Sequence, residues 1–391
     1  MQRNKPSPGR KNPYVRSGVA GHNTPGGRKR SSLPTILRVA ALLILLIGVI
    51  VGLAVGLPRL ASQSSKTVRI NARPSDNIQA FGESVLYYDG MTLYCVDSTG
   101  SSQWAYSLGT GGDYMCTSTM VAAWTGNQIV VLNKSGQPTY ADRVEDVIRF
   151  ARVGESYVAV CFGSDDLNAR VRVMSHTGHL LENFVFSDLY LLDIGFFYTR
   201  EQLMWVLGLD INGSTPSTML STYEPGRMST GAVELQDELV YCVYPHNNNL
   251  MVVDTSKIRT YNYKCVEQTD LASMLTYGWQ VHQTKTIGRN TYALLEQMPQ
   301  SGNASDFYEL RLATNYSMQS LRMTSSCFAS GLSEKGIYGF GENVIYYAPY
   351  GSITFKATPL NFAISELICM LGGGRAVFVY GDDVIIMTLP T

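Results

Sequence analysis

Acidic residues at four places in the chain are the first candidates for chemistry. A glycosidase needs two carboxyl groups flanking one bond, one acting as acid and the other as base or nucleophile. Nothing in the spacing marks any two of the four as partners, and acids beside turns ordinarily cap or solvate them. A hydrolase is therefore an alternative function, not the predicted one. The four candidates are Asp97, Glu145, Asp193 and Glu342.

Histidines and paired aspartates raise the question of metal binding. His176 and His179 lie three residues apart across a tight turn, where we expect loose, solvent-facing side chains. The pairs Asp165-Asp166 and Asp382-Asp383 fall in turns, and acids there are turn formers before they are calcium ligands. We predict no metal site and no cofactor, and we assign no role to the remaining candidates, His246 and His282.

Cysteine usage points to a core role. The seven cysteines never form a CxxC pair, and most lie inside apolar runs, where cysteine acts as a small core residue. A zinc site is not expected, and one or two disulfides remain open. The seven are Cys95, Cys116, Cys161, Cys242, Cys265, Cys327 and Cys369.

Charge and hydropathy divide the chain unevenly. Residues 1–57 hold nine basic residues and no acid, which leaves 22 basic and 31 acidic residues for 58–391, a net charge of −9. Val39–Leu57 carries no charge between Arg38 and Arg59, and about 28 Å of helix matches the hydrocarbon core of a bilayer. A cleaved signal peptide fits less well, because its apolar region is shorter and rarely follows so long a tail. Positive charge then places the tail in the cytoplasm and the rest outside.

The predicted span carries a pattern that permits self-association. Gly48, Gly52 and Gly56 lie four apart on one helix face, so a second helix can approach closely and a homodimer is an option. Glycine is also common in membrane helices, which leaves the plain anchor open. The tail is too polar to fold alone. Its charge is explained by topology, so we expect lipid contact and no nucleic-acid partner.

The rest of the chain predicts an all-β fold built from repeats. Short apolar strands alternate with Gly, Asn, Asp and Ser turns, without a long helical period. Aligned on their turns, hairpin copies recur, and the turn glycines Gly100, Gly136 and Gly178 are 36 and 42 residues apart. That period is typical of a β-propeller with four-stranded blades. The count is seven or eight blades, and the unit near 234–264 is short by one strand.

The chain ends predict how the ring closes. The last segment supplies strands for a blade but no outer strand after Pro390. The run 67–74, just after the span, belongs to no other blade, so we predict that it completes the last one and removes an exposed edge. The predicted organisation is a disordered basic cytoplasmic tail (1–38), a transmembrane helix (39–57), a linker (58–66) and an extracytoplasmic propeller (67–391).

One copy of the repeat resembles a known family. The segment LYCVDSTGSSQWAYSLG resembles the repeat of PQQ-like (quinoprotein-type) β-propellers. The layout of tail, span and blades resembles an uncharacterised family of single-pass membrane-anchored propellers from Gram-positive bacteria. The matching residues are Leu93, Tyr94, Asp97, Thr99, Gly100 and Trp104.

The resemblance implies the fold and not a quinoprotein enzyme. Such an enzyme would need a calcium site, a catalytic aspartate, a tryptophan floor under the cofactor and usually docking tryptophans in every blade. The chain has no vicinal cysteine pair and only Trp104, Trp124, Trp205 and Trp279.

The predicted function is a non-enzymatic binding or scaffolding module at the plasma membrane. Its propeller faces or channel would contact a protein, peptide or glycan outside the cytoplasm. The alternatives are an extracytoplasmic enzyme, glycosidase or quinoprotein-like, and a single-pass sensor signalling through the glycine-faced helix.

Overall fold

The computed structural model describes residues 66–198, 202–298 and 306–391. These residues belong to one compact unit, Ser64–Thr391. The predicted tail, the predicted span with Gly48, Gly52 and Gly56, and nearly all of the linker lie outside the described residues. Within the described ranges, no helix is long and apolar enough to cross a membrane.

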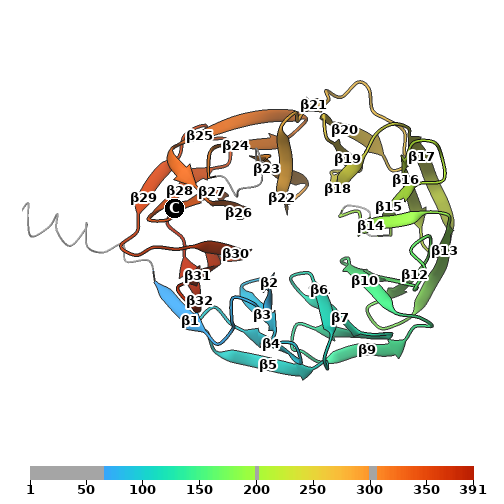
Figure 1. Cartoon of the computed structure of the whole chain (residues 1–391), viewed down its shortest axis with the longest axis horizontal. Coiled ribbons are helices and arrows are strands. Elements are labelled where there is room, and N and C mark those ends of the chain that lie inside the picture. The colour runs from blue at the N-terminus through green and yellow to red at the C-terminus, as the bar shows by residue number, and fades with distance from the viewer. Residues whose placement is uncertain (1–65, 199–201, 299–305) are drawn as a thin grey trace, which may run out of the picture. The chain divides into compact units, whose positions relative to one another are not determined.

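The described residues form an eight-bladed β-propeller. Eight antiparallel sheets of four strands each are arranged as a ring, with one strand of every blade at the centre (Figure 1). The prediction of an all-β propeller with four-stranded blades is confirmed, and the number of blades is eight. From the centre outward, the first four blades are β2 (Asn77–Phe81), β3 (Ser84–Tyr88), β4 (Thr92–Val96) and β5 (Ser102–Ser107); β6 (Gly112–Cys116), β7 (Met120–Thr125), β8 (Gln128–Asn133) and β9 (Pro138–Arg143); β10 (Ile148–Val153), β11 (Tyr157–Phe162), β12 (Asn168–Ser175) and β13 (Leu180–Ser187); and β14 (Tyr190–Phe196), β15 (Met204–Asp210), β16 (Ser217–Glu224) and β17 (Met228–Leu235).

The second half of the ring has the same plan. The last blade is the exception in chain order, because its outer strand comes from the start of the domain. In order, these blades are β18 (Val240–His246), β19 (Asn249–Asp254), β20 (Lys257–Asn262) and β21 (Met274–Leu275); β22 (Trp279–Ile287), β23 (Asn290–Gln297), β24 (Phe307–Thr314) and β25 (Ser317–Cys327); β26 (Ala329–Leu332), β27 (Gly336–Gly341), β28 (Val344–Pro349) and β29 (Lys356–Pro359); and β30 (Glu366–Leu371), β31 (Arg375–Tyr380), β32 (Asp383–Thr388) and β1 (Thr67–Ile70).

The two ends of the propeller close the ring by pairing with each other. β1 is antiparallel to β32, with Thr67 opposite Met387 and Ile70 opposite Val384. The pairing predicted for the run 67–74 is therefore present, over its first four residues. Arg69 adds an ion pair to Asp383 at 2.5 Å. Closure gives the last blade its outer strand and leaves β32 without an unpaired edge.

Each blade buries its middle strands against its neighbours. The second and third strands are almost continuously apolar and buried, as in MVAAWT of β7 and QIVVLN of β8. Apolar clusters fill the spaces between successive blades. The cluster between the last and first blades contains Ile70 of the closing strand together with Val85, Val377 and Ile386. A blade cannot bury both faces alone, so the core exists only in the closed ring.

The innermost strands are irregular at one recurring position. β10, β14, β18, β22 and β30 each carry a bulge where they pair with the second strand of their blade. A bulge inserts one extra residue, bends the strand and redirects side chains. The channel wall is therefore less regular than the sheets behind it.

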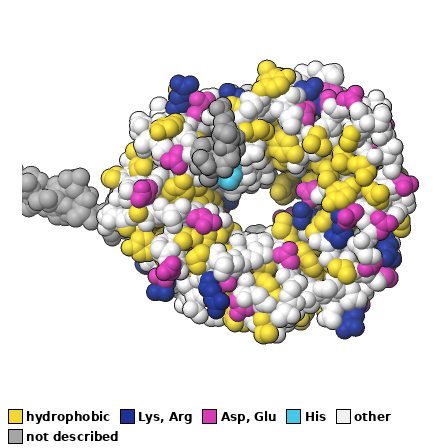
Figure 2. All heavy atoms as spheres, viewed as in Figure 1, with side chains coloured by type: hydrophobic (Ala, Val, Ile, Leu, Met, Phe, Trp, Pro, Cys, Tyr) yellow, Lys and Arg dark blue, Asp and Glu magenta, His cyan; other side chains and the backbone are white. Residues whose placement is uncertain are grey.

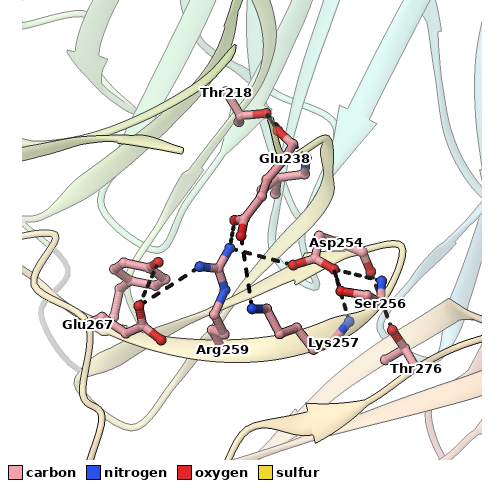
Figure 3. A network of polar contacts seen from close by, with 10 residues as sticks. Thr218, Glu238, Asp254, Ser256, Lys257, Arg259, Glu267 and Thr276 are labelled. Carbon is pink, nitrogen blue, oxygen red and sulfur yellow. Dashed lines mark hydrogen bonds and ion pairs between the residues drawn. The ribbon is translucent and has the colours of Figure 1, made fainter. Parts of the chain in front are cut away.

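The blade predicted to be one strand short has a rudimentary outer strand. β21 has two residues and pairs only with Lys257 and Ile258 of β20. Beyond that point a charged network borders β20 (Figure 3). Arg259, buried, contacts Glu238, lies 3.5 Å from Asp254 and reaches Glu267 at 3.9 Å. The backbone carbonyl of Glu238 accepts a hydrogen bond from Thr218 of the preceding blade at 2.6 Å. Polar contacts thus join the two blades where strand pairing is shortest.

A pair of substitutions in β1 tests the closure. Ile70 is 3% exposed inside the closing core, whereas the side chain of Arg69 is 71% exposed. Ile70→Ala should lower the free energy of unfolding by about 2–5 kcal/mol through lost burial and a cavity. Arg69→Ala, the matched control, should cost less than about 1 kcal/mol, because exposed ion pairs contribute little. Urea denaturation of the two variants measures the difference, and equal small effects would contradict the role of β1.

Candidate functional site

The turn glycines singled out by the repeat lie where one blade meets the next. Gly100, Gly136 and Gly178 connect the third and outer strands of the first three blades, all with φ between +72° and +82°. A Cβ at any of them would come closer than 3.0 Å to the outer strand of the preceding blade. Glycine is thus required for its backbone angle and for the close approach. The neighbouring side chains are Val68 for Gly100, Trp104 for Gly136 and Tyr140 for Gly178.

The same three turns share one hydrogen-bond arrangement. A side-chain oxygen three residues before the glycine accepts bonds from backbone N–H groups two and four positions further on. Such turns mimic a backbone turn with a side chain. The bond from the Thr99 side chain lowers the pKa of the Asp97 carboxyl, which identifies that acid as a turn residue. The accepting residues are Asp97, Asn133 and Ser175.

Trp104 shows how an outer strand grips the next blade. Its ring lies against Gly136, and its Nε1 donates to the carbonyl oxygen of Lys134 in the same turn at 3.0 Å. In the next blade, Thr139 Oγ1 donates to the carbonyl oxygen of His176 at 2.6 Å. The predicted turn positions are therefore blade-to-blade contacts and not ligand sites.

The four acidic candidates go to four separate places. Asp97 lies in its turn, and Glu145 pairs with Arg172 at 2.5 Å. Asp193 lies on innermost strand β14, and Glu342 follows β27 in a different blade. Among the described residues, the contacts of these acids are with other groups and join no two of them. The paired carboxylates of a glycosidase are not formed by this set.

The histidine candidates are also dispersed. The ring of His176 is half-buried and bonds to the carbonyl oxygen of Gly154 at 3.0 Å, so the expected loose, solvent-facing side chain is wrong for this residue, whereas His179 is exposed. Packing against the neighbouring blade holds His176. His246 is buried between blades, where desolvation lowers its pKa. His282 Nδ1 lies 3.6 Å from Glu296 beside the channel.

Neither the histidines nor the paired aspartates build a metal centre. No group of three metal-ligating side chains is found in the part of the chain that the structure describes. Asp165 accepts bonds from Leu167 and Asn168 in its own turn, and Asp166 pairs with Arg149 at 3.1 Å. Asp383 holds Arg69 at the ring closure.

All seven cysteines are free. Cys116 and Cys369 lie on innermost strands, and burial raises the pKa of each thiol to about 12. A thiol with so high a pKa stays protonated near neutral pH and is a poor nucleophile and metal ligand. These cysteines act as core residues.

A hollow in the channel is the best-formed candidate for binding. When all side chains are drawn, an opening remains at the centre of the ring (Figure 2). A space of about 500 Å³ lies along one side of it, which we call the channel hollow. Side chains from β6, β10, β14 and β18, and Thr284 of β22, line it near the carboxyl ends of these strands. Five neighbouring blades thus contribute to one surface.

A charged pair marks the wall of the channel hollow. Arg152 Nε donates to Asp193 Oδ1 at 2.8 Å, which joins β10 to β14. The guanidinium group lies 5.0 Å above the ring of Phe150. The side chains of Arg152 and Asp193 are 30% and 39% exposed, so the pair faces the channel without being fully solvated. The acid was a sequence candidate, but its basic partner was not.

Two glycines shape the same wall. The ring of Phe196 lies against Gly154, and the indole of Trp205 lies against Gly195. Both glycines, both rings and the charged pair belong to the channel hollow. Trp205 is 4% exposed, and its Nε1 has no hydrogen-bond partner. A buried N–H without an acceptor costs free energy, so this donor is an unusual feature of a binding wall.

Comparison with known proteins gives a family. The model of the Family of unknown function (DUF5711) matches residues 61–358. The chain belongs to this family. No curated protein matches its sequence. The DUF5711 match begins just before β1 and covers the first six blades and nearly all of the seventh.

Solved structures share the fold of this DUF5711 protein at low sequence identity. Sqt1 of Saccharomyces cerevisiae is 7% identical, with a TM-score of 0.52 over 83% of this chain and 100% of that one. BamB of Moraxella catarrhalis is 9% identical, with a TM-score of 0.48 over 82% and 98%. The Pan2 WD40 domain of Neurospora crassa is 8% identical, with a TM-score of 0.45 over 81% and 90%. At such identities the likeness concerns the propeller fold alone.

The contact between Gly136 and Trp104 can be tested by a double-mutant cycle. Gly136→Ala should destabilise the protein by about 1–2 kcal/mol from its positive φ, with an added penalty from the clash with the indole. Gly126→Ala is the matched control, because Gly126 also has a positive φ but a Cβ there would meet nothing within 4 Å.

The cycle is completed by Trp104→Ala alone and together with Gly136→Ala. Thermal or urea unfolding should show less than additive losses, because the indole that causes the clash is gone. Strict additivity, or equal losses for Gly136→Ala and Gly126→Ala, would contradict the packing described here.

Proposed function

We propose that this protein is a membrane-anchored binding module whose channel hollow docks a partner outside the cytoplasm. The observation that carries the proposal is the channel hollow itself, about 500 Å³ of mixed polar and apolar surface contributed by five blades. Pockets of this size with a few placed polar groups are the usual form of binding sites. A rigid disc of blades suits such a role, because loops and strand ends from many blades meet on one surface.

The membrane part of the proposal rests on the sequence. Val39–Leu57 would be the anchor, with the basic tail in the cytoplasm and 67–391 outside. We retain in the proposal the relation to PQQ-like, membrane-anchored propellers that the segment Leu93–Gly109 suggests. The dispersal of Asp97, Glu145, Asp193 and Glu342 supports binding without catalysis.

Site-specific photocrosslinking in cells tests where a partner docks. A photoreactive amino acid replaces Thr117 or Thr284, which line the channel hollow, in the full-length chain. The matched control replaces Val185, which is 66% exposed on outer strand β13. Irradiation should give discrete adducts from the two channel positions, because the partner lies within reach of their side chains.

The control should remain free of those adducts. Gel shifts and mass spectrometry identify the adducts and their attachment points. If Val185 gives the same adducts, or if both channel positions give none, then the channel hollow is not the docking site.

A further inference from the structure

We propose that the channel hollow binds a neutral oligosaccharide. This inference rests on the proposed function, because it names the chemistry of the partner that the hollow would dock. Three features of the wall carry it: backbone groups that are already capped, a charged pair that cancels, and aromatic rings set against glycine.

Side chains cap the strand edges that face the channel. Innermost strands pair on one side only, so alternate N–H and C=O groups point into the channel. At Tyr114 both groups are taken, the N–H by Asp113 at 2.8 Å and the C=O by Gln79 at 3.1 Å. Arg152 donates to the carbonyl oxygen of Ala151 at 3.1 Å.

The same holds on the neighbouring strands. Asp193 accepts from the N–H of Ile194 at 2.8 Å, and the hydroxyl oxygen of Tyr241 accepts from the N–H of Val281 at 3.3 Å. A peptide that adds as a strand needs free edge groups. Four strands around the channel hollow have edge groups engaged in this way, so its surface offers side chains and disfavours strand addition.

The charged pair suits hydroxyl groups. A guanidinium group only donates hydrogen bonds and a carboxylate only accepts them, whereas a hydroxyl does both. Arg152 and Asp193 present a donor and an acceptor side by side and cancel each other's charge. Exposed Glu155 leaves the hollow with a net charge of −1, which disfavours phosphates and other anions. A neutral ligand rich in hydroxyls meets these conditions.

Aromatic rings supply the complementary apolar surface. Tyr198, 50% exposed, belongs to the wall together with Phe196. A sugar ring has apolar C–H faces that can pack on such side chains, which combine an apolar body with a polar tip.

The orphan donor lies in the same wall. A Cβ at Gly195 would lie 2.7 Å from Trp205 Nε1, so the missing side chain leaves room beside this N–H. An acceptor oxygen from a ligand in the channel hollow would relieve a donor that the described protein atoms leave without a partner.

Titration of the purified full-length chain in detergent tests the proposal. The probes are maltohexaose, cellohexaose and chitohexaose, three neutral oligosaccharides, with an uncharged extended hexapeptide as comparison. Isothermal titration should show saturable binding of at least one sugar and none of the peptide. Asp193→Asn and Arg152→Gln should each weaken that binding about tenfold, the loss of one charge-assisted hydrogen bond.

Asp142→Asn is the matched control, because Asp142 lies on outer strand β9 beside Tyr140. It should leave sugar binding within about twofold, since charges outside the site contribute little. Circular dichroism confirms that each variant is folded.

The outcomes separate this inference from the proposed function. No heat from any of the three sugars, or equal loss in Asp142→Asn and Asp193→Asn, overturns the sugar proposal. If the sugars fail while Thr117 and Thr284 still crosslink a partner, the channel docks something else and only this inference is lost. Binding of the peptide in preference to the sugars would assign the hollow to a protein segment instead.

Discussion

The pairing of β1 with β32 is the contact on which the rest of the molecule depends. A propeller blade has two apolar faces, and both are buried only when a blade stands on either side of it. The first and last blades can meet this condition only across the junction of the chain ends. There Ile70 of the closing strand packs with Val85 of the first blade and Val377 of the last. One strand of four residues thus determines whether eight blades share a continuous core.

Seating of each blade on its neighbour begins at that same strand. Gly100 lies against Val68 of β1, and the next two turn glycines lie against Trp104 and Tyr140 in the outer strands of the following blades. Where outer strand β21 is reduced to two residues, Arg259 and its acidic partners join the two blades by polar contacts instead. The ring is therefore uniform in plan and variable in chemistry. The variation lets the channel wall differ from blade to blade.

The sequence predicts the outer part of the blades far better than the channel. Second and third strands such as QIVVLN are buried on both faces and read as unbroken apolar runs. The innermost strands do not. IRFARV of β10 and WQVHQTKTI of β22 are half exposed and interrupted by bulges, so they match neither a buried strand nor a strict alternation.

The candidate site was hidden for the same reason. Asp193 stood among four acids of equal standing, and only the fold brings Arg152, 41 residues earlier, to its side. The closing strand could be predicted because it was a surplus strand at one end of a chain that lacked one at the other. Eight blades could be counted only once two-residue β21 was seen as an outer strand.

Amide hydrogen exchange on the full-length chain tests the central claim, that Thr67–Ile70 is part of the propeller core. If β1 closes the ring, amides of Thr67–Ile70 that bond to β32 will be protected as strongly as those of Val384–Met387. Both sets will then lose protection at the same denaturant concentration, because they open as one unit. Fast exchange throughout Thr67–Ile70 while β32 stays protected would contradict the account, since the segment would then be a linker beside an open blade.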